Sequence, residues 1–153
     1  MKAFNFITCN IKVLKNNIMN IHKGYDNSAK NYDLNTNGKG PFCKFKIEDN
    51  VYLKCKGIYV FYIDGQIKYV GRCLSSFARR INGGYGNISP RNCYEGGQST
   101  NCHVNKLVND AIINNKTVKI GLLPLTDEDM IKDLEKILIK IIKPKWNTQL
   151  CNK

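Results

Sequence analysis

Apolar and aromatic residues gather in two short runs near the middle of the chain, at residues 60–63 and 66–70. Both runs are rich in β-branched and aromatic side chains, which favour strands, and Asp64-Gly65 separates them. An Asp-Gly pair readily adopts the positive φ angles of a type I′ turn, so the pattern predicts a β-hairpin. A third apolar run at residues 118–123 predicts a third strand.

Two later segments repeat their apolar residues at the spacing of a helix. These residues are Val104, Leu107, Val108, Ala111 and Ile112 in the first segment, and Ile131, Leu134, Leu138, Ile141 and Ile142 in the second. Thr126 is the expected N-cap of the second helix, carboxylates at 127–129 suit its positive end, and Pro144 ends it. A short helix is also expected from Ser75 or Ser76 to Ile81.

Together these elements predict an α+β fold, with a small and mostly antiparallel three-stranded sheet flanked by helices and the functional site on one sheet face. Residues 1–50 are predicted to form a basic N-terminal extension, and residues 51–153 the folded domain. The extension is polar and weakly periodic, which suits both an arm that contacts DNA and a partly disordered tail. Residues 83–102 form a long Gly- and Asn-rich loop, and loops of that length are usually functional or disordered.

Charge adds a candidate partner. The chain has 24 Lys and Arg against 12 Asp and Glu, a net charge of +12, which attracts polyanions such as nucleic acid. A compositional drift toward Lys, Asn and Ile would produce a similar excess. Drift does not explain why all four arginines fall between Arg72 and Arg91.

The seven cysteines are irregularly spaced, and residues 1–20 do not resemble a secretory signal. We therefore expect reduced thiols in a cytoplasmic protein. No run of 18 apolar residues predicts a membrane span. Zinc held by Cys93, Cys102 and His103 is not favoured, because no Cys-x-x-Cys pair accompanies them.

Glu135 is the carboxylate most closely surrounded by the apolar stripe of the last helix. Its neighbours at i−4, i+3, i+4 and i+7 are Ile131, Leu138, Ile139 and Ile142. An unpaired charge beside a core is costly, so Glu135 is expected to meet an arginine or a metal. The alternative, slightly favoured by helix geometry alone, is a glutamate at the edge of the stripe that lifts its carboxylate into solvent.

The predicted hairpin carries tyrosines beside cations. Lys68 and Arg72 flank Tyr69, and Arg79-Arg80 follow shortly after. Strand tyrosines are usually packing residues, and adjacent helical arginines usually form a solvated face. Guanidinium groups are also the preferred partners of phosphate oxygens.

Gly57-Ile58-Tyr59, followed by Tyr69-Val70-Gly71, resembles the paired signature of the GIY-YIG nucleases. Three further positions match that family: Arg80 in the following helix, Glu135 in the last helix, and Asn147 after Pro144. The resemblance covers about residues 57–150. The loop at residues 84–102 resembles the branch of the family that includes small type II restriction endonucleases.

This resemblance implies hydrolysis of a DNA phosphodiester with one divalent ion. Glu135 would bind Mg²⁺ (or Mn²⁺), Tyr59 would orient or deprotonate the attacking water, and Arg80 would hold the scissile phosphate. A free phenol has a pKa near 10, so a base role for Tyr59 needs a nearby cation, for which Lys68 is the candidate, with Tyr69 as a second phenol. The metal would stabilise the leaving 3′ oxygen.

Two departures from the family pattern affect this assignment. The position four residues after Arg80, often His in the family, is Gly84, and Tyr85 follows it as a substitute phenol. A strict two-residue turn would also pair Tyr59 with Val70 and place Lys68 on the face of Tyr59, whereas a turn one residue longer would bring Tyr69 there.

The remaining expectations concern DNA and assembly. Arg72 and Arg79 are expected to contact DNA, and Arg91 and Gln98 to read base edges, to touch phosphates or to make no contact. Gly71 and Asn147 are expected to have structural roles near the site. The predicted protein is a homodimeric restriction-type endonuclease acting on double-stranded DNA. The alternatives are a non-cleaving DNA-binding module, or a repair or mobile-element nuclease acting on branched DNA.

Overall fold

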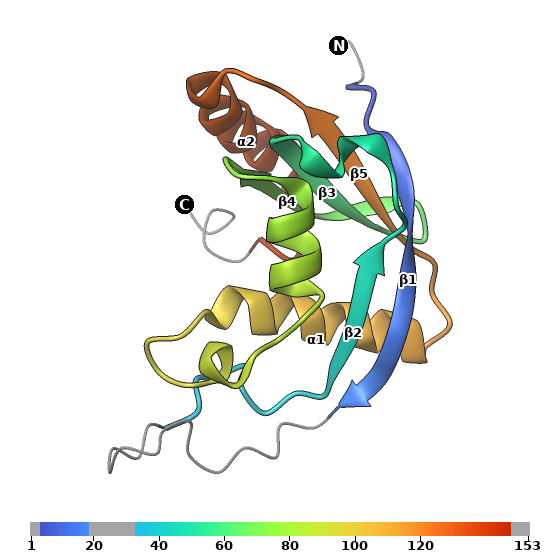
Figure 1. The fold of residues 1–153 in the computed structure, drawn as a ribbon, viewed down its shortest axis with the longest axis vertical. Helices are drawn as coiled ribbons and strands as arrows, with labels where there is room; N and C mark the ends of the chain where they lie inside the picture. The colour runs from blue at the N-terminus through green and yellow to red at the C-terminus, as the bar shows by residue number, and fades with distance from the viewer. Residues whose placement is uncertain (1–3, 19–32, 148–153) are drawn as a thin grey trace.

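The computed structural model describes residues 4–18 and 33–147, which form one five-stranded antiparallel sheet with helices (Figure 1). The strands are β1 (Ile7–Ile18), β2 (Phe42–Ile47), β3 (Gly57–Ile63), β4 (Gln66–Cys73) and β5 (Val118–Pro124), in the order β2-β1-β5-β3-β4. The helical elements are η1 (Val51–Lys54), the π-helical η2 (Ala78–Tyr85), η3 (Pro90–Cys93), α1 (Ser99–Ile113) and α2 (Glu128–Ile142). The α+β class is confirmed.

The prediction of three strands is wrong, because β1 and β2 extend the sheet beyond β5. β1 pairs with β5 through residues 7–10 and with β2 through residues 11–18. The pairing with β2 shifts between Val13 and Lys15 and again between Lys15 and Ile18. Such bulges interrupt the period-two alternation that reveals a strand in a sequence. The sequence therefore predicts only an extension with some short helix or strand for residues 1–40, and not two strands of the main sheet.

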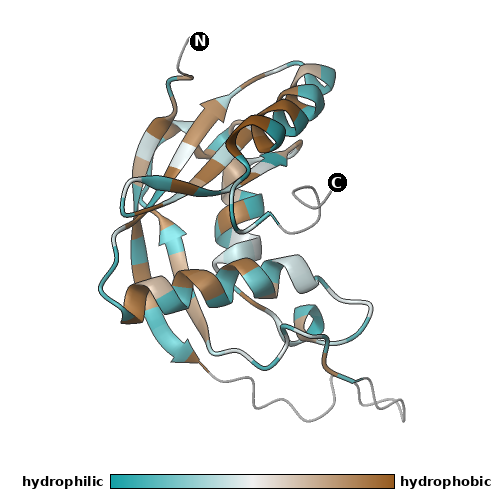
Figure 2. Cartoon of the chain, turned by 180° about the vertical axis from the view of Figure 1, so that it is seen from behind, coloured by the Kyte–Doolittle hydropathy of each residue, from teal (hydrophilic) through white to brown (hydrophobic). Residues whose placement is uncertain are grey.

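Helices cover the two sheet faces unequally. One face packs against η2 and α1 and contains the larger core, which includes Phe45, Phe61 and Val108. On the other face, α2 covers β3 and β4, and Ile131 and Leu138 pack there against the sheet. In Figure 2, which shows the molecule from behind, α1 crosses in front of the sheet.

The register of the β3–β4 hairpin is set by a bulge rather than by a longer turn. Asp64 and Gly65 have φ angles of 50° and 79°, as a type I′ turn requires, so the predicted hairpin forms. The ladder then shifts by one residue, so that Tyr59 pairs with Gly71 and not with Val70. The extra residue is Lys68. The pairing of Tyr59 with Val70, which a strict two-residue turn predicts, is therefore wrong, because β4 bulges at Lys68.

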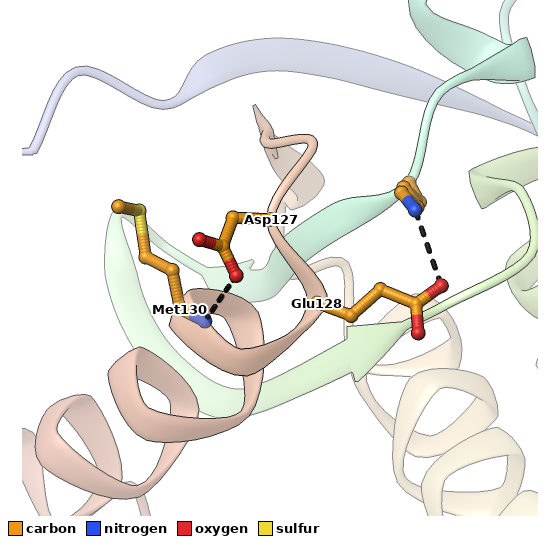
Figure 3. Close-up of polar contacts among 4 residues, drawn as sticks. Asp127, Glu128 and Met130 are labelled. Atoms are coloured by element: carbon orange, nitrogen blue, oxygen red, sulfur yellow. Dashed lines mark hydrogen bonds and ion pairs between the residues drawn. The ribbon is translucent and has the colours of Figure 1, made fainter.

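The start of α2 is fixed by two polar contacts (Figure 3). Asp127 caps the helix by accepting a hydrogen bond from the backbone N–H of Met130 at 3.1 Å. Glu128 forms an ion pair with Lys56 at 3.1 Å. The cap therefore lies one residue after the expected Thr126. Within the described ranges, the structure contains no helix with both the length and the apolarity to cross a bilayer.

Candidate active site

Three buried tyrosines bring their hydroxyl groups together beside the β3–β4 hairpin. The Oη atoms of Tyr59 and Tyr85 are 2.8 Å apart, and Tyr85 donates a hydrogen bond to Tyr69 at 3.1 Å. The exposed fractions of these residues are 1% for Tyr59, 9% for Tyr69 and 0% for Tyr85. The bulge in β4 turns Tyr69 onto the face of Tyr59, and η2 supplies Tyr85. The sequence-predicted phenols thus form one hydrogen-bonded cluster.

Gly71 provides the space that the ring of Tyr59 occupies. A Cβ atom at this position would lie 2.4 Å from both Cζ and Oη of Tyr59, far inside van der Waals contact. Gly71 pairs directly with Tyr59 across the hairpin. The glycine is therefore needed for its lack of a side chain rather than for an unusual backbone angle.

Arg80 lies against this cluster and makes three hydrogen bonds to neutral oxygens. Its guanidinium donates to Tyr59 at 3.3 Å, to Tyr85 at 2.8 Å and to Oδ1 of Asn101 at 3.1 Å. Its Cζ lies 4.5 Å from the ring centroid of Tyr85, within the range of a cation–π contact. Because η2 is π-helical, Arg80 and Tyr85, five residues apart, face the same site.

Burial keeps the phenols neutral in this state. Burial, followed by the proximity of Tyr69, raises the pKa of Tyr59 well above its usual range, and the opposing charge of Arg80 does not offset this. Burial likewise raises the pKa of Tyr69 and of Tyr85. Although burial disfavours the charge of Arg80, the adjacent phenols of Tyr59 and Tyr85 raise its pKa, so the guanidinium stays protonated.

Glu135 meets an arginine instead of turning into solvent. Its Oε2 forms an ion pair with Arg72 at 2.9 Å, and its side chain is 17% exposed against 38% for Arg72. Burial raises the pKa of Glu135, while Arg72 acts in the opposite direction. Among the described residues, none donates a hydrogen bond to Oε1, the second carboxylate oxygen of Glu135.

The donor set around Glu135 suits a hard, hydrated cation. Mg²⁺ commonly binds proteins through one or two carboxylates and keeps waters and substrate phosphates as its other ligands. No group of three His, Cys, Asp or Glu side chains gathers in residues 4–18 and 33–147, so a cage built only from those side chains is not formed there. The Sγ atoms of Cys93 and Cys102 lie 4.0 Å apart in a separate apolar cluster.

Asn147 holds β4 at the level of the phenols. Its side chain accepts from the backbone N–H of Val70 at 2.9 Å and donates to the carbonyl of Val70 at 2.8 Å. The N–H of Trp146 donates to the carbonyl of Lys68 at 2.8 Å. The segment after α2 thus binds β4 at and just beyond the bulge.

Lys68 lies apart from the phenol cluster. It is the bulged residue, and its Nζ donates to the Gln66 side chain at 3.1 Å. None of its contacts with described residues reaches Tyr59, whose neighbouring cation is Arg80. The geometry therefore brings Arg80, rather than Lys68, to the phenol.

A polar pocket of about 420 Å³ adjoins Arg80, and none of the three tyrosines lines it. Its lining includes Arg79, Arg80, Gln98 and Asn101, and no carboxylate is among the described residues that line it. Arg91 lies on η3 with an exposed side chain outside this lining. Of the four residues expected at DNA, the structure places Arg79 and Gln98 in one pocket, Arg72 at Glu135, and Arg91 elsewhere.

Asn101 is a site residue that the sequence reasoning missed. It is 3% exposed, accepts from Arg80 and donates to Oε1 of Gln98 at 2.9 Å. Asn101, Asn105 and Asn109 recur at intervals of four on α1, and all three are buried. Buried polar side chains need hydrogen-bond partners. The i, i+4, i+8 spacing of these asparagines in the sequence therefore indicates a polar helix face that contacts other polar groups.

Comparisons with known proteins add little to this description. No protein-family model and no curated protein matches the chain. Among solved structures, a mutant of bacteriophage T4 EndoII resembles part of it, with 22% sequence identity and a TM-score of 0.49. The match covers 76% of this chain and 86% of the EndoII chain. A likeness this slight carries no functional argument, so function is argued from the site.

Proposed function

We propose that this chain is a divalent-metal-dependent endonuclease of the GIY-YIG type that hydrolyses DNA phosphodiester bonds. The observation that carries the proposal is Arg80, a half-buried residue whose guanidinium is bonded to two phenols and an amide but to no carboxylate of the described chain. Such a group is oriented and charged, and a phosphate oxygen would complete its coordination. The half-buried Glu135 supplies the carboxylate that the same chemistry needs.

The phenol cluster fixes the direction in which Tyr59 points its proton. Tyr85 donates its one hydroxyl proton to Tyr69, so Tyr59 in turn donates to Tyr85. Tyr59 also accepts from Arg80, which would stabilise a phenolate, and one lone pair remains for a water. We assign to Arg80 the role expected of Lys68. Since Tyr59 is 1% exposed, the side chains around it must rearrange before a water reaches the phenol.

The other residues hold the reacting groups in place. Arg72 orients the carboxylate of Glu135, Asn101 orients Arg80, and Asn147 fixes the strand that carries Tyr69. Mg²⁺ at Glu135 would neutralise charge on the leaving 3′ oxygen. Arg79 and Gln98 in the adjoining pocket would contact the nucleotides beside the scissile phosphate.

The finer form of the proposal is a restriction-type enzyme that acts on double-stranded DNA as a homodimer. It is supported by the resemblance of the loop at residues 84–102 and by the usual assembly of small restriction enzymes, which cut both strands as dimers. Cleavage at one site per recognition sequence would distinguish it from a repair or mobile-element nuclease.

The test incubates supercoiled plasmid DNA with the protein, with Mg²⁺, Mn²⁺ or EDTA, beside Glu135→Ala and Glu128→Ala variants. Both glutamates lie on α2, but Glu128 pairs with Lys56 outside the site, so Glu128→Ala is the matched control. Cutting by the wild type and by Glu128→Ala, lost in Glu135→Ala and in EDTA, is expected. Binding without cutting under every metal would show a non-cleaving DNA-binding module instead.

A further inference from the structure

One region of the sheet carries five lysines on the face opposite to the phenol cluster. Lys12 pairs directly with Lys46, and Lys15 with Lys44, across β1 and β2. On the neighbouring strand, Lys119 pairs with Asn10, which shares the face of Lys12. We call these five residues the lysine face.

No described helix covers the lysine face. α1 packs on the opposite side of β1 and β2, as Figure 1 shows by the two strands passing in front of it. α2 covers the same side of the sheet only over β3 and β4. Accordingly Lys12, Lys15, Lys44 and Lys119 are exposed, and Lys46 is half-buried.

Among residues 4–18 and 33–147, no ion pair neutralises the lysine face. The described residues form two ion pairs, Lys56–Glu128 and Arg72–Glu135, and neither includes these lysines. The nearest acids in sequence, Glu48 and Asp49, follow the end of β2 and pair with none of them. Like charges directly opposite one another destabilise a sheet, so these positions work against the stability of the fold.

We propose that the lysine face is a second DNA-binding surface, which holds the phosphate backbone of a duplex without reading its sequence. Naming DNA as the occupant rests on the proposed nuclease function; the charge of the surface does not. Lysine ammonium groups act on phosphates as point charges and release counterions on binding, which gives affinity without specificity. Because the phenol cluster lies on the other sheet face, DNA held by the lysine face would not touch the phenols there.

The test measures binding of a labelled DNA duplex in EDTA by fluorescence anisotropy over a range of salt concentrations. The variant Lys12→Gln/Lys44→Gln removes one lysine from each opposed pair. The control Lys132→Gln/Lys140→Gln removes the same charge from α2. In the variant we expect at least about tenfold weaker binding at low salt, and a slope of log K against log salt that is smaller by about 0.9 for each lost contact.

Two further readouts make the outcome decisive. Thermal denaturation should show the lysine-face variant to be at least as stable as wild type, because removing opposed like charges relieves repulsion. Equal losses of affinity in variant and control would overturn the proposal, as would preferential binding to phosphatidylserine vesicles over duplex DNA. Since binding is measured without metal, this failure is separate from failure of the plasmid-cutting test.

Discussion

At the scale of single residues, the charge of Arg80 is preserved because the side chains bonded to it are neutral. Arg80 is surrounded by two phenols and an amide, so its charge is directed but not cancelled. Tyr59, Arg80 and Glu135 are singled out in the sequence because their types and order resemble a family motif, and their roles remain predictions. The spacing of Asn101, Asn105 and Asn109 indicates a buried polar stripe, but only the folded structure shows that Asn101 is the one that meets the guanidinium.

Asn101 is expected to be a positioning residue for Arg80. Asn101→Ala removes an acceptor without touching the phenols, so we expect the cleavage rate to fall about 10- to 100-fold while DNA binding in EDTA changes little. Asn109→Ala is the control, because Asn109 is equally buried on α1 but bonds to Asn17 of β1. Loss of activity in both variants would mean that α1 packing, and not the contact to Arg80, is responsible.

Gly71 should tolerate no side chain. In Gly71→Ala the new methyl group must displace the ring of Tyr59, so we expect a loss of about 1–3 kcal/mol in the free energy of unfolding together with loss of cleavage. Gly83→Ala is the comparison for stability, because beyond the adjacent backbone the nearest atom to a Cβ there is the carbonyl oxygen of Ala78 at 4.0 Å. Urea denaturation and plasmid cutting measure the two effects, and normal activity in Gly71→Ala would contradict this account of the ring's position.

At the scale of elements, the hairpin was predictable and its register was not. Two apolar runs around Asp64-Gly65 identify the strands and the turn, because those preferences are local. The bulge at Lys68 depends on contacts from residues far away in sequence, since Trp146 and Asn147 bind the backbone on either side of Tyr69. The bulge that places Tyr69 beside Tyr59 is thus bound by the segment after α2, which a local sequence pattern does not reveal.

Asn147→Ala should therefore weaken β4 locally. The N–H and carbonyl of Val70 would lose their partners in a buried place, at a cost of about 2–4 kcal/mol in the free energy of unfolding. Hydrogen exchange at the amide of Val70 should accelerate more than exchange at Val60 on the other side of the hairpin. Uniform acceleration across both strands would indicate global destabilisation without a local role.

At the scale of the whole molecule, the sheet is wider than its predicted core. β1 and β2 were missed because exposed lysines and two register shifts obscure the alternation of their buried residues. The α+β class does not depend on β1 and β2, because β3, β4, β5 and the two long helices have clear periodicity. The order of the strands could not be predicted, since β5 is inserted between β1 and β3 by pairings over long sequence distances.

The stability of the molecule should fall in alkaline solution. The pKa values of Tyr59, Tyr69 and Tyr85 are raised in the folded state, whereas unfolded phenols ionise near pH 10. Below that pH the folded and unfolded states bind equal numbers of these protons. Above it the unfolded state loses protons that the folded state retains, so the free energy of unfolding decreases as pH rises, by about 1.4 kcal/mol per pH unit for each phenol.

Urea denaturation at several pH values above 9 measures this slope, and absorbance at 295 nm follows phenol ionisation directly. In Tyr85→Phe the slope should decrease by the contribution of one proton, because one buried phenol no longer differs between the two states. A slope that is identical in wild type and variant would show that Tyr85 titrates in the folded protein as it does in the unfolded chain.

The Arg72–Glu135 ion pair gives the protein an internal counterion at the carboxylate proposed to bind metal. A divalent cation arriving alone must compete with a guanidinium that is already in place, so its affinity for the free protein is reduced. A phosphate that draws Arg72 away removes that competition, and by thermodynamic reciprocity bound metal then favours phosphate binding to the same degree. If Glu135 binds metal as proposed, metal and phosphate would be taken up together, and the metal-bound form of the free protein would stay rare until DNA is present.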